Sequence, residues 1–200
     1  INPDTDFGLQ KSSSGFGDLA ISPFIIQWPE IRLFGVATYQ RLNLLFKIPT
    51  GRYDKDADVN PGDHVFSFNP YYSVTQLWTP KLSTSFRFYY LWSSKNNDPA
   101  QGLAVDDTQP GQAFHFNYAL SYLVHPDWRI GFSGYYLKQF TDDRIDGESV
   151  SGSKEQVFGI GPGFRYQNRY FSMRLNYYFE SEVENRPRGN KLNLVFSKVF

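Results

Sequence analysis

Cationic and phenolic side chains recur along this chain at every second position, the spacing that places residues on one face of a β-strand. With the asparagines and glutamates on the same face, the predicted lumen set comprises Tyr39, Arg41, Lys47, Tyr71, Arg87, Tyr89, His115, Asn117, Arg129, Tyr135, Arg165, Arg174, Asn176, Tyr178, Glu180 and Glu182. Phenol rings combine apolar contact with a hydroxyl group, and guanidinium groups bind carboxylates. On one enclosed surface these residues would line a path for small aromatic or carboxylated solutes. The alternative is a packed interior held by Arg–Glu and Arg–Tyr contacts.

His115 suggests a different chemistry, because Asn117 and Ser121 follow it on the same face of its segment. A histidine base beside a serine nucleophile would give a hydrolase. The chain has no Gly-x-Ser-x-Gly elbow, and no carboxylate lies on the same segment to orient the histidine. We therefore expect no catalytic residues and no enzymatic activity.

An acidic segment from Asp54 to Asn60 has the alternating oxygen ligands of a calcium loop. A calcium loop of this type needs glycine at its sixth position, where this chain has Val59, and glutamate at its twelfth. We interpret the segment as a solvated acidic loop. The sequence predicts no metal site and no cofactor.

The composition excludes several classes of protein. The formal net charge is zero without a basic block, which gives no reason to expect a nucleic-acid partner. There is no cysteine, so neither a disulfide nor a thiolate metal site can form. Mean hydropathy is −0.47, and the chain lacks the apolar run of about 18 residues that a transmembrane helix needs. Aromatic residues make up 18%, which suits β-strands and interfacial belts.

About nine segments alternate between apolar and polar residues with a period of two. Within 82–94, for example, Phe86 and Phe88 share one face, whereas Arg87 and Tyr89 share the other. The predicted strands are 18–28, 34–48, 65–78, 82–94, 113–124, 128–140, 155–166, 171–184 and 190–200. One face is oily throughout, so it requires either a second sheet or lipid against it. Lys138 and Lys198 fall on this face near strand ends, where their side chains can reach the membrane surface.

The connectors between these segments alternate in length, as in outer-membrane barrels with short periplasmic turns and long extracellular loops. The short connectors are 28–32, 79–81, 125–127 and 167–170, and the longer ones are 50–64, 95–112, 141–154 and 185–189. Trp28, Trp78 and Trp128 fall at the short-turn rim, as an aromatic girdle would. The last strand ends in Phe200, an aromatic residue on the oily face. Together these features predict an all-β, antiparallel transmembrane β-barrel in the outer membrane of a Gram-negative bacterium.

Three motifs resemble the family of outer-membrane channel proteins linked to the meta-pathway of phenol degradation. They are Ser14–Leu19 (SGFGDL), Phe46–Asp54 (FKIPTGRYD) and Asn185–Gly189 (NRPRG). The resemblance implies a monomeric barrel of about twelve strands that takes up small hydrophobic, often aromatic, compounds. It implies no catalytic residues. An odd strand count and this resemblance both lead us to expect that residues 1–200 form a single β-barrel domain lacking N-terminal strands.

The main functional hypothesis is therefore passive uptake of small hydrophobic or aromatic solutes through an outer-membrane channel, with outer-membrane lipid as its surroundings. Two alternatives remain open at this point. One is a lipid-acting enzyme that uses His115 as its base. The other is a structural or adhesive barrel with a filled lumen, which would bind through the acidic loop of residues 54–63.

Overall fold

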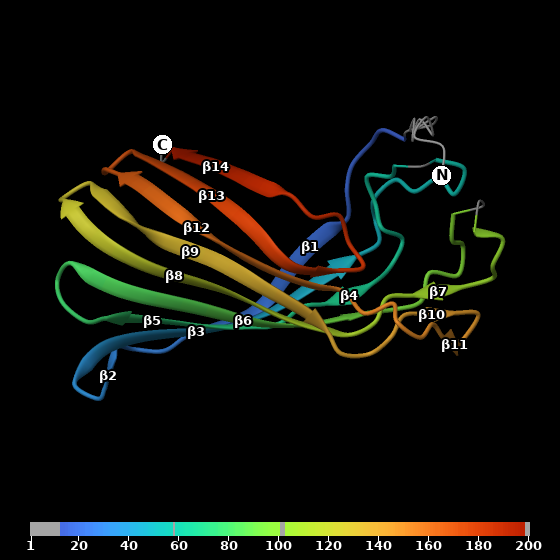
Figure 1. The fold of residues 1–200 in the computed structure, drawn as a ribbon, viewed down its shortest axis with the longest axis horizontal. Helices are drawn as coiled ribbons and strands as arrows, with labels where there is room; N and C mark the ends of the chain where they lie inside the picture. The colour runs from blue at the N-terminus through green and yellow to red at the C-terminus, as the bar shows by residue number, and fades with distance from the viewer. Residues whose placement is uncertain (1–12, 58, 101–102, 199–200) are drawn as a thin grey trace.

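The computed structural model describes residues 13–57, 59–100 and 103–198. They form one curved antiparallel sheet, with a smaller sheet at one end (Figure 1). The strands that run the length of the large sheet are β1 (Leu19–Gln27), β3 (Val36–Ile48), β5 (Tyr71–Leu77), β6 (Leu82–Ser93), β8 (Ala113–His125), β9 (Trp128–Gln139), β12 (Gln156–Gln167), β13 (Phe171–Glu184) and β14 (Asn190–Lys198). Across these described ranges no helix is long and apolar enough to cross a membrane. The nine predicted strands and the all-β antiparallel class are confirmed.

One predicted strand, 65–78, is divided into β4 (Ser67–Phe68) and β5. The break falls at Pro70, which has no N–H to donate to the ladder between strands. The backbone stays in line because Asn69 N–H donates to Leu45 O at 2.8 Å, and Tyr90 N–H donates to Pro70 O at 3.2 Å. The segment therefore acts as one strand between β3 and β6.

The predicted turn at 28–32 is wrong. The chain continues past Pro29 into β2 (Ile31–Leu33), which pairs with β3. It reverses only at Phe34 and Gly35, whose φ angles are +52° and +79°. A two-residue hairpin turn of type I′ needs positive φ at both central positions, and it matches the twist of the flanking strands. Pro29 interrupts the strand because it cannot donate to β3.

The short turns lie at one end of the sheet and the long loops at the other, as Figure 1 shows. At the long-loop end, loops 95–112 and 141–154 are joined by a sheet that the sequence did not predict. It consists of β7 (Thr108–Gln109), β10 (Arg144–Ile145) and β11 (Glu148–Ser149). Asp146 reinforces the junction, since its Oδ1 accepts hydrogen bonds from the N–H groups of Asp106 and Asp107 at 2.7 and 2.9 Å.

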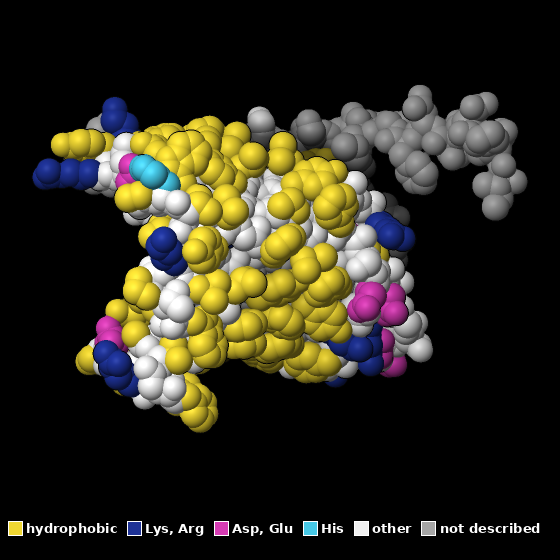
Figure 2. Space-filling view, turned by 60° about the vertical axis from the view of Figure 1, so that its left-hand side comes forward, with side chains coloured by type: hydrophobic (Ala, Val, Ile, Leu, Met, Phe, Trp, Pro, Cys, Tyr) yellow, Lys and Arg dark blue, Asp and Glu magenta, His cyan; other side chains and the backbone are white. Residues whose placement is uncertain are grey.

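The outer face of the large sheet is oily and exposed. Figure 2 shows hydrophobic side chains gathered over the centre of the face in view, with most charged side chains at its margins. Phe132, Phe179 and Leu192 are 59%, 53% and 64% exposed, respectively. Within the described ranges, the buried hydrophobic residues are only Ala57, Val65, Ala113 and Val157. A contiguous apolar surface without a packed core beneath it needs an apolar medium or a partner to cover it.

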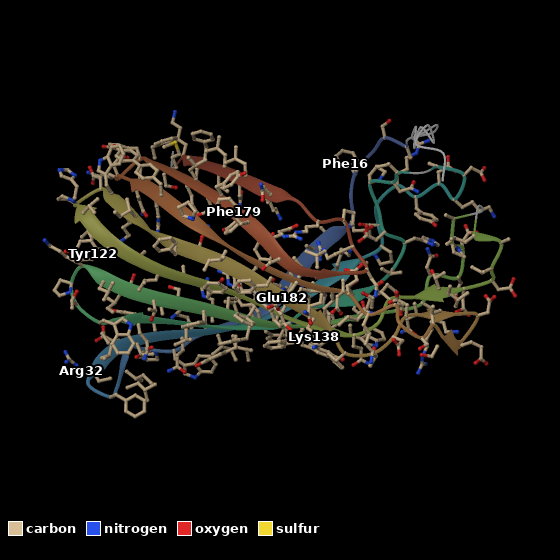
Figure 3. All side chains as sticks on the ribbon, in the orientation of Figure 1. Phe16, Arg32, Tyr122, Lys138, Phe179 and Glu182 are labelled. Atoms are coloured by element: carbon tan, nitrogen blue, oxygen red, sulfur yellow. The ribbon has the colours of Figure 1, made fainter. Side chains whose placement is uncertain are left out.

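The strand ends carry the amphipathic side chains. Trp28, Trp78 and Trp128 lie at the short-turn end and are 39–49% exposed. Figure 3 places Lys138 at the long-loop end of β9, consistent with the predicted reach of its amine beyond the apolar region. Lys198 ends β14 at the opposite end. Phe200, the predicted aromatic terminus, lies outside the described residues.

Candidate permeation path

The concave face of the sheet borders an open cavity of about 920 Å³, with walls from β5, β6, β8, β9, β12, β13 and β14. Polar and aromatic side chains from alternate positions of these strands line it. The predicted residues on its wall are Arg87, His115, Asn117, Arg129, Tyr135, Arg165, Arg174, Asn176 and Tyr178. These residues come from positions 87 to 178, and the sheet register brings them together.

Other predicted residues share this face without lining the cavity itself. Tyr71 on β5 and Tyr89 on β6 lie in register with His115 on β8, which does line the cavity. On β3, Tyr39 pairs with Thr75 and Arg41 pairs with Ser73. Both of these β5 partners line the cavity. Lys47 forms an ion pair with Asp63 near the long-loop end.

An aromatic ladder, formed by Tyr71, Tyr89 and His115, crosses the long-loop half of the concave face. The Tyr71 and Tyr89 ring centroids are 5.2 Å apart, and the Tyr89 and His115 rings stack at 4.2 Å with an interplanar angle of 11°. The Arg87 guanidinium lies 4.8 Å from the Tyr71 centroid and donates to the Tyr89 hydroxyl at 3.1 Å. Asn43 donates to the Tyr71 hydroxyl at 3.0 Å. Tyr89 and His115 cover one another's faces and Arg87 covers Tyr71, so the ladder offers a solute fixed ring edges.

A second cluster surrounds Tyr135. Its hydroxyl donates to Glu180, and its ring makes an edge contact with Tyr178 at 5.2 Å. The Tyr135 ring occupies the space where Gly159 has no side chain, and a Cβ at that position would lie 2.6 Å from the ring. Ser133 donates to the Tyr178 hydroxyl at 3.3 Å and closes the network.

The two predicted acidic residues of β13 behave differently. Glu180 lies opposite Gly159 on the concave face and also accepts a hydrogen bond from the N–H of Gly189 at 3.0 Å. It therefore anchors the last loop as well as Tyr135. Glu182 has a φ of +50° in a stretch where the register between β12 and β13 shifts. Strict alternation fails there, so the pattern that put Glu182 in the lumen does not extend to it; Figure 3 shows it toward the long-loop end of β13.

An arginine row, formed by Arg129, Arg165 and Arg174, crosses the short-turn half of the concave face. Arg165 is the direct partner of Arg129 on β9 and of Arg174 on β13. Arg129 Nη1 lies 3.4 Å from Ser83 Oγ and 3.3 Å from Ser121 Oγ. These hydroxyls face the cavity, which establishes the direction in which the Arg129 side chain points.

Hydroxyl pairs were missed by the sequence analysis. Thr75 pairs with Ser85 at 2.9 Å and Ser83 with Ser121 at 3.0 Å, both on the concave face. Small hydroxyl residues satisfy one another across neighbouring strands and leave the lumen wide. The available signal was serine at alternate positions of one strand, as in Ser83 and Ser85.

His115 does not form the pair that a hydrolase would require. Its Nε2 lies 3.3 Å from Asn69 Oδ1, and its ring stacks on Tyr89. Ser121, the proposed nucleophile, bonds to Ser83 and Arg129 instead. In the part of the chain that the structure describes, no group of three or more His, Cys, Asp or Glu residues could hold a metal ion. Asp58 of the acidic loop lies outside that part.

The chain resembles known proteins both in its sequence and in its fold. The family model described as "Putative MetA-pathway of phenol degradation" matches residues 2–196. The chain belongs to this family. A crystal structure of an outer membrane channel from Pseudomonas putida F1 has the same fold, with a TM-score of 0.79 and 17% sequence identity. The match covers 92% of this chain and 67% of that one. No curated protein sequence matches the chain.

The three motifs quoted above lie at the long-loop end of the sheet. Asp18 of the first motif accepts hydrogen bonds from Gly51 N–H and Asp63 N–H, each at 2.9 Å. Arg52 N–H donates to Phe16 O at 2.9 Å, which joins the first and second motifs directly. In the third motif, Asn185 donates to the carbonyl oxygen of Gly152 at 2.6 Å. All three motifs therefore hold loops in place around this end of the sheet.

Proposed function

We propose that this protein is a channel of the Gram-negative outer membrane that admits small hydrophobic and aromatic molecules passively, as a monomer. One observation carries the proposal: the same sheet has an exposed oily face and, opposite it, a polar and aromatic cavity. Membership of a family linked to phenol degradation and the fold of an outer membrane channel both support it. Lipid would cover the oily face, and the cavity would be part of the path.

Passive passage requires only weak contacts with the cavity wall. It requires contacts weak enough for release and regular enough to guide the solute. The aromatic ladder supplies fixed ring edges, and each aromatic contact contributes roughly 0.5–1.5 kcal/mol beyond the burial of area. The hydroxyl pairs between the ladder and the short turns are already satisfied by one another, so they do not hold a solute strongly.

The proposal is tested by placing the same bulky residue on either face of β8. Asn117 is exposed on the concave face between Arg87 and Tyr135, whereas Phe114 is 41% exposed on the outer face. Cells producing the full-length protein should accumulate the hydrophobic dye N-phenyl-1-naphthylamine faster than cells with an empty vector. Asn117→Trp should slow this uptake, and Phe114→Trp should leave it unchanged. Equal rates with and without the protein would refute the proposal.

A barrel with a filled, structural lumen is the second candidate. The network of Tyr135, Glu180, Tyr178 and Ser133 favours it, because these side chains bond to one another across the lumen wall. This candidate predicts that the purified protein carries no ionic current and that Asn117→Trp has no effect on uptake.

A further inference from the structure

The arginine row places three cations in direct register, which is unfavourable for the fold. Residues directly opposite each other on neighbouring strands have Cβ atoms about 4.5–5.5 Å apart, and like charges there are destabilising. Arg165 is opposed in this way on both sides, by Arg129 and by Arg174. Five other cations of the described chain do have a carboxylate within 4.0 Å, namely Lys47, Lys55, Lys95, Lys154 and Arg186.

None of the three arginines has such a carboxylate among the described residues. The polar contacts of Arg129 are Ser83 and Ser121, and Arg165 donates to Gln167. Asp127 and Arg169 line the hollow below Arg129 and Arg165, and no ion pair joins Asp127 to either arginine. The charge of the row is thus uncompensated by the described part of the protein.

The row borders the main cavity, because all three arginines line it. Gly131 and Gly163 are direct partners one inward-facing position above Arg129 and Arg165, and both line the cavity. Neither adds a side chain there. Asn176 pairs with Gly163 on β13, and its amide covers that glycine, because a Cβ on Gly163 would lie 2.6 Å from Asn176 Oδ1.

We infer that the arginine row is an anion-binding station in the path and that it favours small aromatic carboxylates over neutral or cationic aromatics of the same size. This inference rests on the proposed function, with which it shares the path. Guanidinium groups bind carboxylates through paired, charge-assisted hydrogen bonds. The aromatic ring would meet the ladder first, at the long-loop half, and the carboxylate would then meet the arginine row before leaving at the short turns.

The test compares benzoate with phenyltrimethylammonium, which have the same ring and opposite charges. Reversal potentials are measured in planar bilayers that contain the full-length protein, at pH 8. Wild type should favour benzoate, and Arg165→Gln should reduce the permeability ratio by roughly fivefold, the loss expected for one charged partner. Arg144→Gln is the matched control, because Arg144 is an exposed cation in the small loop sheet away from the lumen. An equal reduction in both variants, or no preference in wild type, would overturn the inference.

A second readout needs no current. Thermal unfolding of the full-length protein in detergent is followed with and without benzoate. Benzoate should raise the Tm of wild type and of Arg144→Gln but not of Arg165→Gln. Without benzoate, Arg165→Gln should be at least as stable as wild type, because it removes like-charge repulsion. A benzoate effect that depends on Arg165 in a protein without conductance would uphold the station and refute the channel. Conductance without any benzoate effect or preference would uphold the channel and refute the anion-binding station.

Discussion

The carboxylate of Asp18 holds the backbone of Gly51 at the start of the first long loop. Asp18 Oδ1 accepts from Gly51 N–H at 2.9 Å, and its other oxygen accepts from Asp63 N–H at the end of the same loop. The side chain is only 4% exposed. A carboxylate buried against two backbone donors satisfies both ends of the loop at once and fixes the loop against β1.

Removing this carboxylate should loosen the loop without unfolding the sheet. Asp18→Ala removes the acceptor of two N–H groups that water can partly reach, so each lost hydrogen bond costs about 0.5–1.5 kcal/mol. Limited proteolysis of the folded full-length protein should then cut within residues 50–64 much faster than in wild type. Asp106→Ala, at an exposed position in another loop, is the control and should leave that rate unchanged. An unaltered cleavage rate in Asp18→Ala would contradict the anchoring role.

Gly159 makes room for Tyr135, and a side chain there should be costly. A Cβ would lie 2.6 Å from the Tyr135 ring, so Gly159→Val forces the ring away from Glu180 and Tyr178. We expect a loss of about 1–3 kcal/mol, as for other overpacked sites. Heat-modifiability on gels measures the resulting fall in the unfolding temperature. Gly189→Ala should be silent by the same measure, because nothing lies within 4 Å of its added Cβ.

Much of the fold was predictable because each strand carries its own signal. The period of two separates Phe86 and Phe88 from Arg87 and Tyr89 without knowledge of any partner strand. The hairpin at Phe34–Gly35 was missed because Pro29 is the stronger turn signal, although it only interrupts the strand. The small loop sheet was missed because strands of two residues have no period to detect.

The candidate site was predictable residue by residue but not as an arrangement. Alternation placed Arg129, Arg165 and Arg174 on the inner face separately. Their alignment depends on the register between strands, which the turns at Pro126 and Asn168 set. Alternation failed at Glu182, because the pairing of β12 and β13 is irregular there. This irregularity depends on the partner strand and cannot be predicted from the sequence of β13 alone.

The aromatic ladder should distinguish aromatic from aliphatic solutes. Tyr89→Ala removes the middle ring between Tyr71 and His115, so uptake of an aromatic dye should fall roughly threefold to tenfold. Uptake of an aliphatic solute of similar size should change little. Tyr122→Ala, on the outer face at the short-turn end (Figure 3), is the matched loss of a tyrosine outside the lumen. A uniform fall for both solutes would indicate a collapsed path instead of a lost ladder.

Adjacent residues on β14 test which face meets lipid. Leu194 is 50% exposed in the middle of the strand, and Asn193 lines the cavity. A lysine on the lipid face costs about 2–4 kcal/mol at the bilayer midplane, so Leu194→Lys should reduce the folded fraction in vesicles. Asn193→Lys should fold as wild type does. The opposite ranking would mean that the two faces are assigned the wrong way round.

Single-channel recording in a planar bilayer tests the channel most directly. Full-length wild-type protein and Phe114→Trp should give steady unitary currents of equal size, because residue 114 faces outward. Asn117→Trp should give smaller currents, because its ring would project into the cavity. Absence of current from correctly folded wild-type protein, or equal currents from all three proteins, would contradict a path along the concave face.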